Sequence, residues 1–154
     1  MVHAVAPKHV SFLSFCAANV LIDVEPLHYM ITRQFPIHRF FHTFIGATVI
    51  LLVTVALFLA ALKLASVVSL PDIFGWKQLT IHQVAIGAGL GSYSHILLDS
   101  LMHIDIRPLA PFSEANPLLR LVSLSTLHWS CLAAGALGLA LIGLRKVLST
   151  NDRL

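Results

Sequence analysis

Residues 91–100 have the sequence GSYSHILLDS and close an apolar run that begins near residue 79. If this stretch is helical, His95 and Asp99 lie one turn apart on the same face, because residues four apart are neighbours on a helix. Placing a histidine and an aspartate in a hydrophobic span costs free energy, so their presence there indicates a function. The stretch therefore predicts a membrane helix that carries a functional polar pair at one end.

The composition is that of an integral membrane protein. The chain has 154 residues, of which 57% are hydrophobic and only 11% are charged, far more apolar than a usual soluble domain. The net charge is +3, and the basic residues are scattered, without the basic stripe that nucleic-acid binding uses. We therefore expect the lipid bilayer as a partner and no nucleic acid.

The apolar pattern predicts an all-α protein with about four hydrophobic helices in a bundle, forming one membrane-embedded domain over residues 1–154. The expected helices cover residues 10–24, 38–70, 79–102 and 118–144. The first is short for a full crossing, which takes about 20 residues, so we expect it to be short or partly re-entrant. Pro26 should limit further helix, which makes residues 25–37 a connector, and residues 103–117 form a loop.

Successive helices that alternate in direction bring three polar pairs to one side of the membrane. The pairs are Asp23 with Glu25, His38 with His42, and His95 with Asp99. Imidazole and carboxylate ligands suit zinc, and also manganese or iron. The convergence therefore predicts one metal site at a membrane face, which would activate water as a nucleophile.

Several further residues have candidate roles around this site. Glu25 is a candidate general base or a ligand of a second metal. Arg39 and Arg107 are interfacial anchors or stabilise an anionic substrate group. His9 precedes Asp23 by 14 residues, about 21 Å along a straight helix, so it joins the site only if this segment is broken or re-entrant.

Four motifs occur in a suggestive order: DVEP at residues 23–26, HRFFHT at 38–43, GSYSHILLDS at 91–100 and PLAPF at 108–112. In this order they resemble the membrane-bound, predicted metal-dependent hydrolases of the YdjM-like family, over residues 9–112. The resemblance implies a helical membrane protein that is a metal-dependent hydrolase. The chain departs from the family pattern in its Asp-Val-Glu element and in a four-residue spacing between the two histidines.

The arrangement is also distantly similar to that of zinc-dependent phospholipase C and the S1/P1 nucleases. That similarity implies a zinc shared by the residues Asp23, one of the His38/His42 pair, His95 and Asp99. It also implies that His9 matches an early histidine ligand.

The leading prediction is hydrolysis of a phosphoester. Because the site is expected at the level of the lipid headgroups, the substrate could be linked to a lipid. The alternatives are a non-enzymatic metal carrier or sensor, a structural membrane protein, and a haem electron-transfer protein. The haem alternative would use two histidine pairs, His82 with His95 and His28 with His42.

The distribution of basic residues predicts an orientation. The side with both termini carries Lys8, Lys63, Lys77, Arg145, Lys146 and Arg153, and the site side carries Arg33, Arg39, Arg107 and Arg120. The positive-inside rule then predicts cytoplasmic termini, in an inner (cytoplasmic) membrane, with the site on the extracytoplasmic side.

Overall fold

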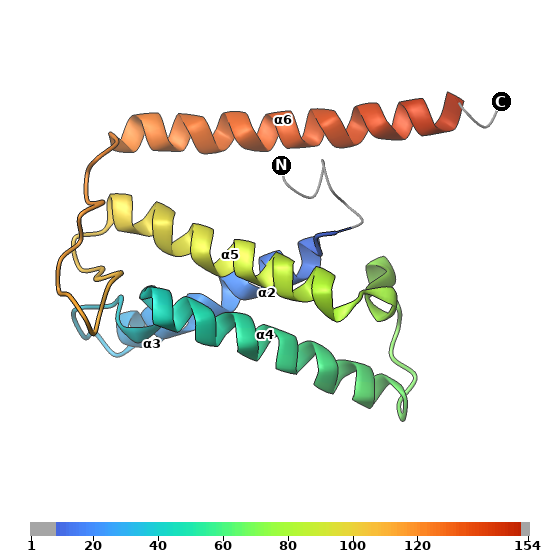
Figure 1. The fold of residues 1–154 in the computed structure, drawn as a ribbon, viewed down its shortest axis with the longest axis horizontal. Coiled ribbons are helices and arrows are strands. Elements are labelled where there is room, and N and C mark those ends of the chain that lie inside the picture. Colours follow the sequence, from blue (N-terminus) through green and yellow to red (C-terminus); the bar gives the residue numbers. More distant parts are fainter. Residues whose placement is uncertain (1–8, 152–154) are drawn as a thin grey trace.

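A computed structural model describes residues 9–151, with the side chains at 145–147 and 149–151 left out, and all the regular secondary structure in that range is helical (Figure 1). Its α-helices are α2 (Phe12–Ile22), α3 (Val24–Ile31), α4 (Phe44–Ala65), α5 (Ile81–Met102) and α6 (Leu124–Asn151). Two 3-10 helices, η1 (Phe40–His42) and η2 (Ile73–Gln78), precede α4 and α5. The all-α prediction is confirmed.

The number of membrane-length apolar helices is two, not about four. In the described part of the chain only Phe44–Ala65 and Leu124–Leu144 are long and apolar enough to cross a membrane. Helix α2 has 11 residues, about 16 Å of helix against a hydrocarbon core of about 30 Å. Helix α5 has 22 residues, but its glycines, serines, histidines and aspartate lower its hydropathy.

Two predicted boundaries were wrong. Residues 24–31 form α3 despite Pro26, because this proline is the third helical residue, where the backbone N–H has no intrahelical partner to lose. The expected long helix over 38–70 is interrupted at Thr43, whose extended backbone (φ −116°, ψ 160°) separates η1 from α4. His38 and His42 therefore do not share one α-helical face.

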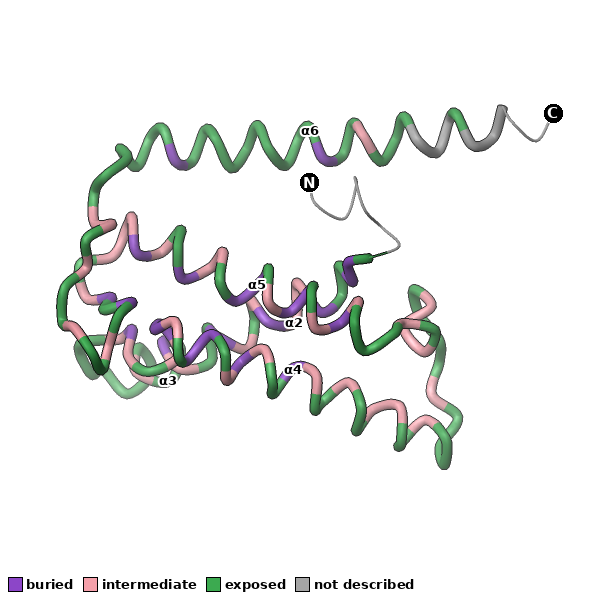
Figure 2. Tube along the Cα trace, in the orientation of Figure 1, coloured by how far each residue is buried: buried purple, intermediate pink, exposed green. Residues whose placement is uncertain are grey.

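Helices α2, α4 and α5 pack side by side, and glycines allow the close approach of α2 to α5. A Cβ on Gly87 would lie 2.2 Å from the carbonyl oxygen of Ser11, and one on Gly91 would lie 2.6 Å from that of Phe15. A larger residue at either position would therefore force the two helices apart. Buried residues follow the facing sides of these helices (Figure 2), and the core cluster is Ala18, Ile22, Ala47, Ile50, Ala88 and Ile96.

Helix α6 begins at Leu124, six residues after the expected start, and lies to one side of the other helices (Figure 1). Nearly all its described side chains are exposed. The loop before it returns across the end of α5, where the Asn116 side chain donates to the Ser100 carbonyl oxygen at 2.9 Å. This contact holds the last turn of α5, which carries the polar residues of the site.

Candidate metal centre

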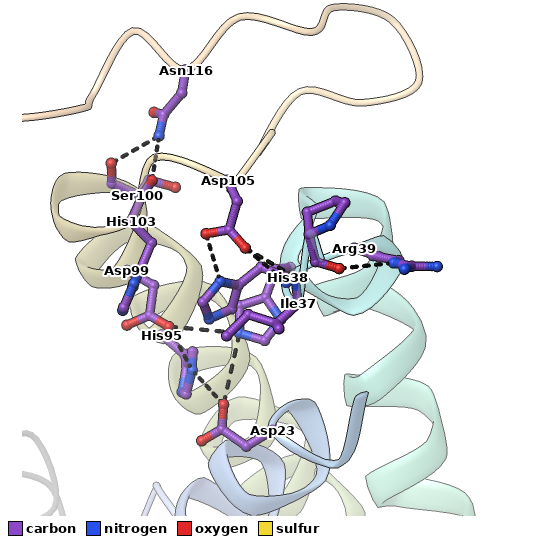
Figure 3. Close-up of polar contacts among 12 residues, drawn as sticks. Asp23, Ile37, His38, Arg39, His95, Asp99, Ser100, His103, Asp105 and Asn116 are labelled. Atoms are coloured by element: carbon purple, nitrogen blue, oxygen red, sulfur yellow. Dashed lines mark hydrogen bonds and ion pairs between the residues drawn. The ribbon is translucent and has the colours of Figure 1, made fainter. Parts of the chain in front are cut away.

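Four side chains from three separate elements meet at one end of the α2–α4–α5 bundle (Figure 3). Asp23 lies between α2 and α3, His42 ends η1, and His95 and Asp99 project from α5. One ligand atom from each lies within 4.8 Å of the others. The structure thus brings together four of the predicted metal ligands and selects His42 from the His38/His42 pair.

The two imidazoles face the same two carboxylate oxygens. The Nε2 atom of His95 lies 3.2 Å from Asp23 Oδ1 and 3.1 Å from Asp99 Oδ2. The Nε2 atom of His42 lies 3.7 Å and 3.6 Å from the same oxygens. Two nitrogens and two oxygens therefore surround one point, which is the donor set that zinc accepts in proteins.

Three of the four imidazole nitrogens in this group lack hydrogen bonds. His42 is fully buried, and neither its Nδ1 nor its Nε2 has a hydrogen-bond partner among the described residues; the same holds for Nε2 of His95. A buried polar atom without a partner costs about 1–3 kcal/mol. A cation at the common point would remove that cost for the two Nε2 atoms, so the residues fit a divalent metal.

Asn19 sets the tautomer of His95. Its Oδ1 lies 3.0 Å from His95 Nδ1, and its Nδ2 donates to the Phe15 carbonyl oxygen at 2.8 Å, which fixes the orientation of the amide. Nδ1 of His95 therefore carries a proton, which leaves Nε2 as the ring atom that would donate its lone pair to a metal. Asn19 was not among the residues predicted for the site, although it is polar, lies in an apolar run and precedes Asp23 by four residues.

The charges of the cluster depend on one another. Burial favours a higher pKa for Asp23, but His42 and His95 outweigh it and hold the pKa of this carboxyl well below its usual range. Burial also acts to lower the pKa of His42, but the carboxylates of Asp23 and Asp99 outweigh it and raise that pKa. The group is therefore an anionic pocket that attracts positive charge, whether protons or a metal.

A second group of metal-ligand type, His38, His103 and Asp105, adjoins the first. Asp105 accepts from the His38 ring at Nδ1 (2.9 Å) and from the backbone N–H groups of Ile37 (3.1 Å) and His38 (3.2 Å). These contacts lower the pKa of Asp105 despite its burial. His103 and Asp105 were predicted only as part of the loop over 103–117, because their partner His38 lies 65 or more positions away.

A cavity of about 680 Å³ opens onto both groups. Its polar wall consists of Asp23, His38, His95, Asp99 and His103, and its apolar wall includes Val20, Val24, Leu27 and Met30. The side chain of Asp23 is 57% exposed. The site therefore has room for water and for a further ligand.

Glu25 and Arg39 lie outside both groups. The Glu25 carboxylate accepts from the backbone N–H groups of Phe40 (3.1 Å) and Phe41 (2.8 Å), so both oxygens hold η1 in place. The predicted role of Glu25 as general base or second-metal ligand has no counterpart in this geometry. Arg39 lies over the Tyr29 ring, 3.7 Å from its centroid, which is an anchoring contact.

Arg107 and His9 are also outside the two groups. Arg107 is exposed and pairs with Glu114. Together with Arg39 it lines a separate cavity of about 540 Å³. His9 is exposed and precedes the uninterrupted helix α2, at the end opposite Asp23. The condition for His9 to reach the site, a broken or re-entrant segment, is therefore not met between residues 12 and 22.

No protein-family model matches the chain, and no curated protein or solved structure gives a match. The resemblance to the YdjM-like hydrolases therefore stays a prediction from the motifs.

Proposed function

We propose that this protein is a membrane-bound, metal-dependent hydrolase that acts on a phosphoester at the membrane face. One observation carries the proposal: buried imidazole nitrogens without hydrogen bonds converge with two carboxylates beside an open cavity. Zinc suits this donor set best, and manganese or iron would also be accepted.

Each side chain has a defined part in this proposal. A divalent metal held here would supply a water of lowered pKa and polarise a phosphoryl oxygen. His42 is the fully buried ligand and Asp99 faces it from α5, while Asn19 keeps the lone pair of His95 turned inward. Asp23, on the exposed side, borders the cavity that would admit the substrate.

The apolar side chains beside the cavity favour an amphiphilic, lipid-like phosphoester. Val20, Val24 and Leu27 line it and are 68%, 51% and 52% exposed. Ile31, which continues the same helical face, is 72% exposed. Such a row is unfavourable in water and suits lipid tails, so the tail of a substrate would lie along it while its phosphate reaches the metal ligands.

The alternatives fit the site less well. A metal carrier or structural site would favour a closed ligand shell, whereas this one borders open space. A bis-histidine haem would need a porphyrin between His42 and His95, yet the Nε2 atoms of both contact the same oxygen of Asp99. His28 and His82, the other histidines of the haem alternative, are exposed.

The proposed cellular setting follows from charge alone. We place the protein in the inner (cytoplasmic) membrane, with both termini in the cytoplasm and the site outside. Among the basic residues behind this assignment, Lys8 and Arg153 lie outside the described residues.

The test is metal analysis and hydrolysis by the full chain purified in detergent. Wild type should contain zinc and cleave at least one of a soluble phosphomonoester, a soluble phosphodiester and a phospholipid in mixed micelles. His95→Ala and Asp99→Asn should lose metal and activity together, whereas His82→Ala, an exposed position on the same helix, should retain both. Unchanged metal content in both site variants would refute the site, and metal without hydrolysis of any substrate would favour a carrier.

A further inference from the structure

We propose that His38 and His103 bind a second divalent metal ion of the zinc class, immediately beside the first. The inference rests on the proposed function in one respect, since the second ion would share the cavity of the proposed hydrolytic site. Its ligands are different residues, so the two proposals can fail separately.

The four histidines form a continuous row. Ring centroids are 4.5 Å apart between His103 and His38, 4.6 Å between His38 and His42, and 5.4 Å between His42 and His95. His42 and His95, at one end of this row, belong to the first group. His38 and His103, at the other end, therefore adjoin the first group through the contact between His38 and His42. Figure 3 shows His38 between Asp105 and the Asp99–His95 side of the site.

Asp105 orients the His38 ring and is not itself a main ligand of the proposed metal. One carboxylate oxygen is engaged by Nδ1 of His38, and the other by two backbone N–H groups. The proton of His38 is thus held on Nδ1, which leaves Nε2 with its lone pair.

His103 is held by the end of α5. Its backbone N–H donates to the Asp99 carbonyl oxygen at 2.8 Å, and the Asn116 side chain donates to its carbonyl oxygen at 3.5 Å. His103 is the C-cap of α5 and follows Asp99 by four residues, as Asp99 follows His95. Asp99 consequently stands between the two groups, and all three side chains line the same cavity.

The donor chemistry indicates which ion would bind. Two imidazole nitrogens favour zinc, manganese or iron over magnesium or calcium, which prefer oxygen ligands. The cavity allows water to complete the coordination. The expected stoichiometry is therefore two zinc ions per chain.

The test uses the full chain in detergent, freed of metal with a chelator, loaded with Zn²⁺ and passed through gel filtration before elemental analysis. Wild type and the control His82→Gln should retain two zinc ions per chain. His103→Gln and His95→Gln should each retain one. Asp105→Asn should weaken the affinity of one of the two ions about 10- to 100-fold, the usual effect of losing a carboxylate behind a ligating histidine.

The opposing results are distinct. A wild-type protein with one zinc, which His95→Gln loses and His103→Gln keeps, overturns the second site and leaves the first intact. One zinc that His103→Gln loses and His95→Gln keeps overturns the first site. If His103→Gln has wild-type helicity by circular dichroism and retains two zinc ions, His103 is not a ligand and the inference is wrong.

Discussion

Asn19 offers a sharp test of the metal centre, because it is not one of the four ligand candidates and contacts this group through His95. In wild type, the Asn19 oxygen keeps the His95 proton on Nδ1. In Asn19→Leu that acceptor is lost, and the ring can regain a hydrogen bond by moving its proton to Nε2. That atom already lies 3.2 Å and 3.1 Å from two carboxylate oxygens. The proton then occupies the atom that the metal needs.

Asn19→Leu should bind zinc more weakly whether the His95 proton moves to Nε2 or stays on Nδ1. If the proton moves, the metal must displace a hydrogen-bonded proton from Nε2. If it stays on Nδ1, the ring loses the acceptor that orients it and makes it a more basic ligand. Loss of such a partner weakens metal binding about 10- to 100-fold, or about 1.4–2.7 kcal/mol. Asn19→Asp keeps the acceptor and should retain wild-type affinity or exceed it.

The assay is zinc titration of the detergent-purified variants in competition with a chelator of known affinity. Circular dichroism controls for the helical content of each variant. Equal affinity of Asn19→Leu and wild type would refute the assignment of Nε2 as the ligand atom. Equal loss in Asn19→Leu and Asn19→Asp would show that the position matters for packing and not for the proton.

Three further predictions test the site and its support. Zinc occupancy should fall as the pH is lowered through the pKa of His42, which is raised above its ordinary value of 6.5, because protons compete with the metal for this ring. Dialysis at stepped pH followed by elemental analysis measures the occupancy. Constant occupancy from pH 8 to about 5 would contradict the prediction. Gly91→Ala should lower the unfolding temperature, because the added Cβ would lie 2.6 Å from the Phe15 carbonyl oxygen, at a cost of about 1–3 kcal/mol. Gly135→Ala, with nothing within 4 Å, is its control. Glu25→Gln should destabilise the fold by about 1–2 kcal/mol while retaining metal binding, whereas loss of hydrolysis at unchanged stability would restore its role as a base.

The helical character of the chain and part of the site were predictable, because they depend on local spacing. The pairing of His95 with Asp99 follows from the helical period, and it holds in α5. The number of membrane-length helices was overestimated, since an apolar run with polar interruptions, such as α5, can be stabilised by packing on α2 and α4 instead of by lipid.

Other features depended on contacts between distant segments. The break at Thr43 could not be read from an apolar run, because it needs the Glu25 carboxylate to hold the N–H groups of Phe40 and Phe41. Because of that break, His42 lies in the first group and His38 lies beside Asp105. Spacing along one helix left open which of the two histidines would join the first group.

By itself, the sequence determined that the protein is all-helical and apolar, and that Asp23, His42, His95 and Asp99 are candidate metal ligands, because residue type and helical period are local properties. Only the tertiary structure decided which lone pairs face inward and which carboxylates orient a histidine instead of binding a metal. The physical reason is that a tautomer or a ligand set depends on the hydrogen-bond partner of each ring nitrogen. For His95 and His38 those partners, Asn19 and Asp105, lie 76 and 67 residues away.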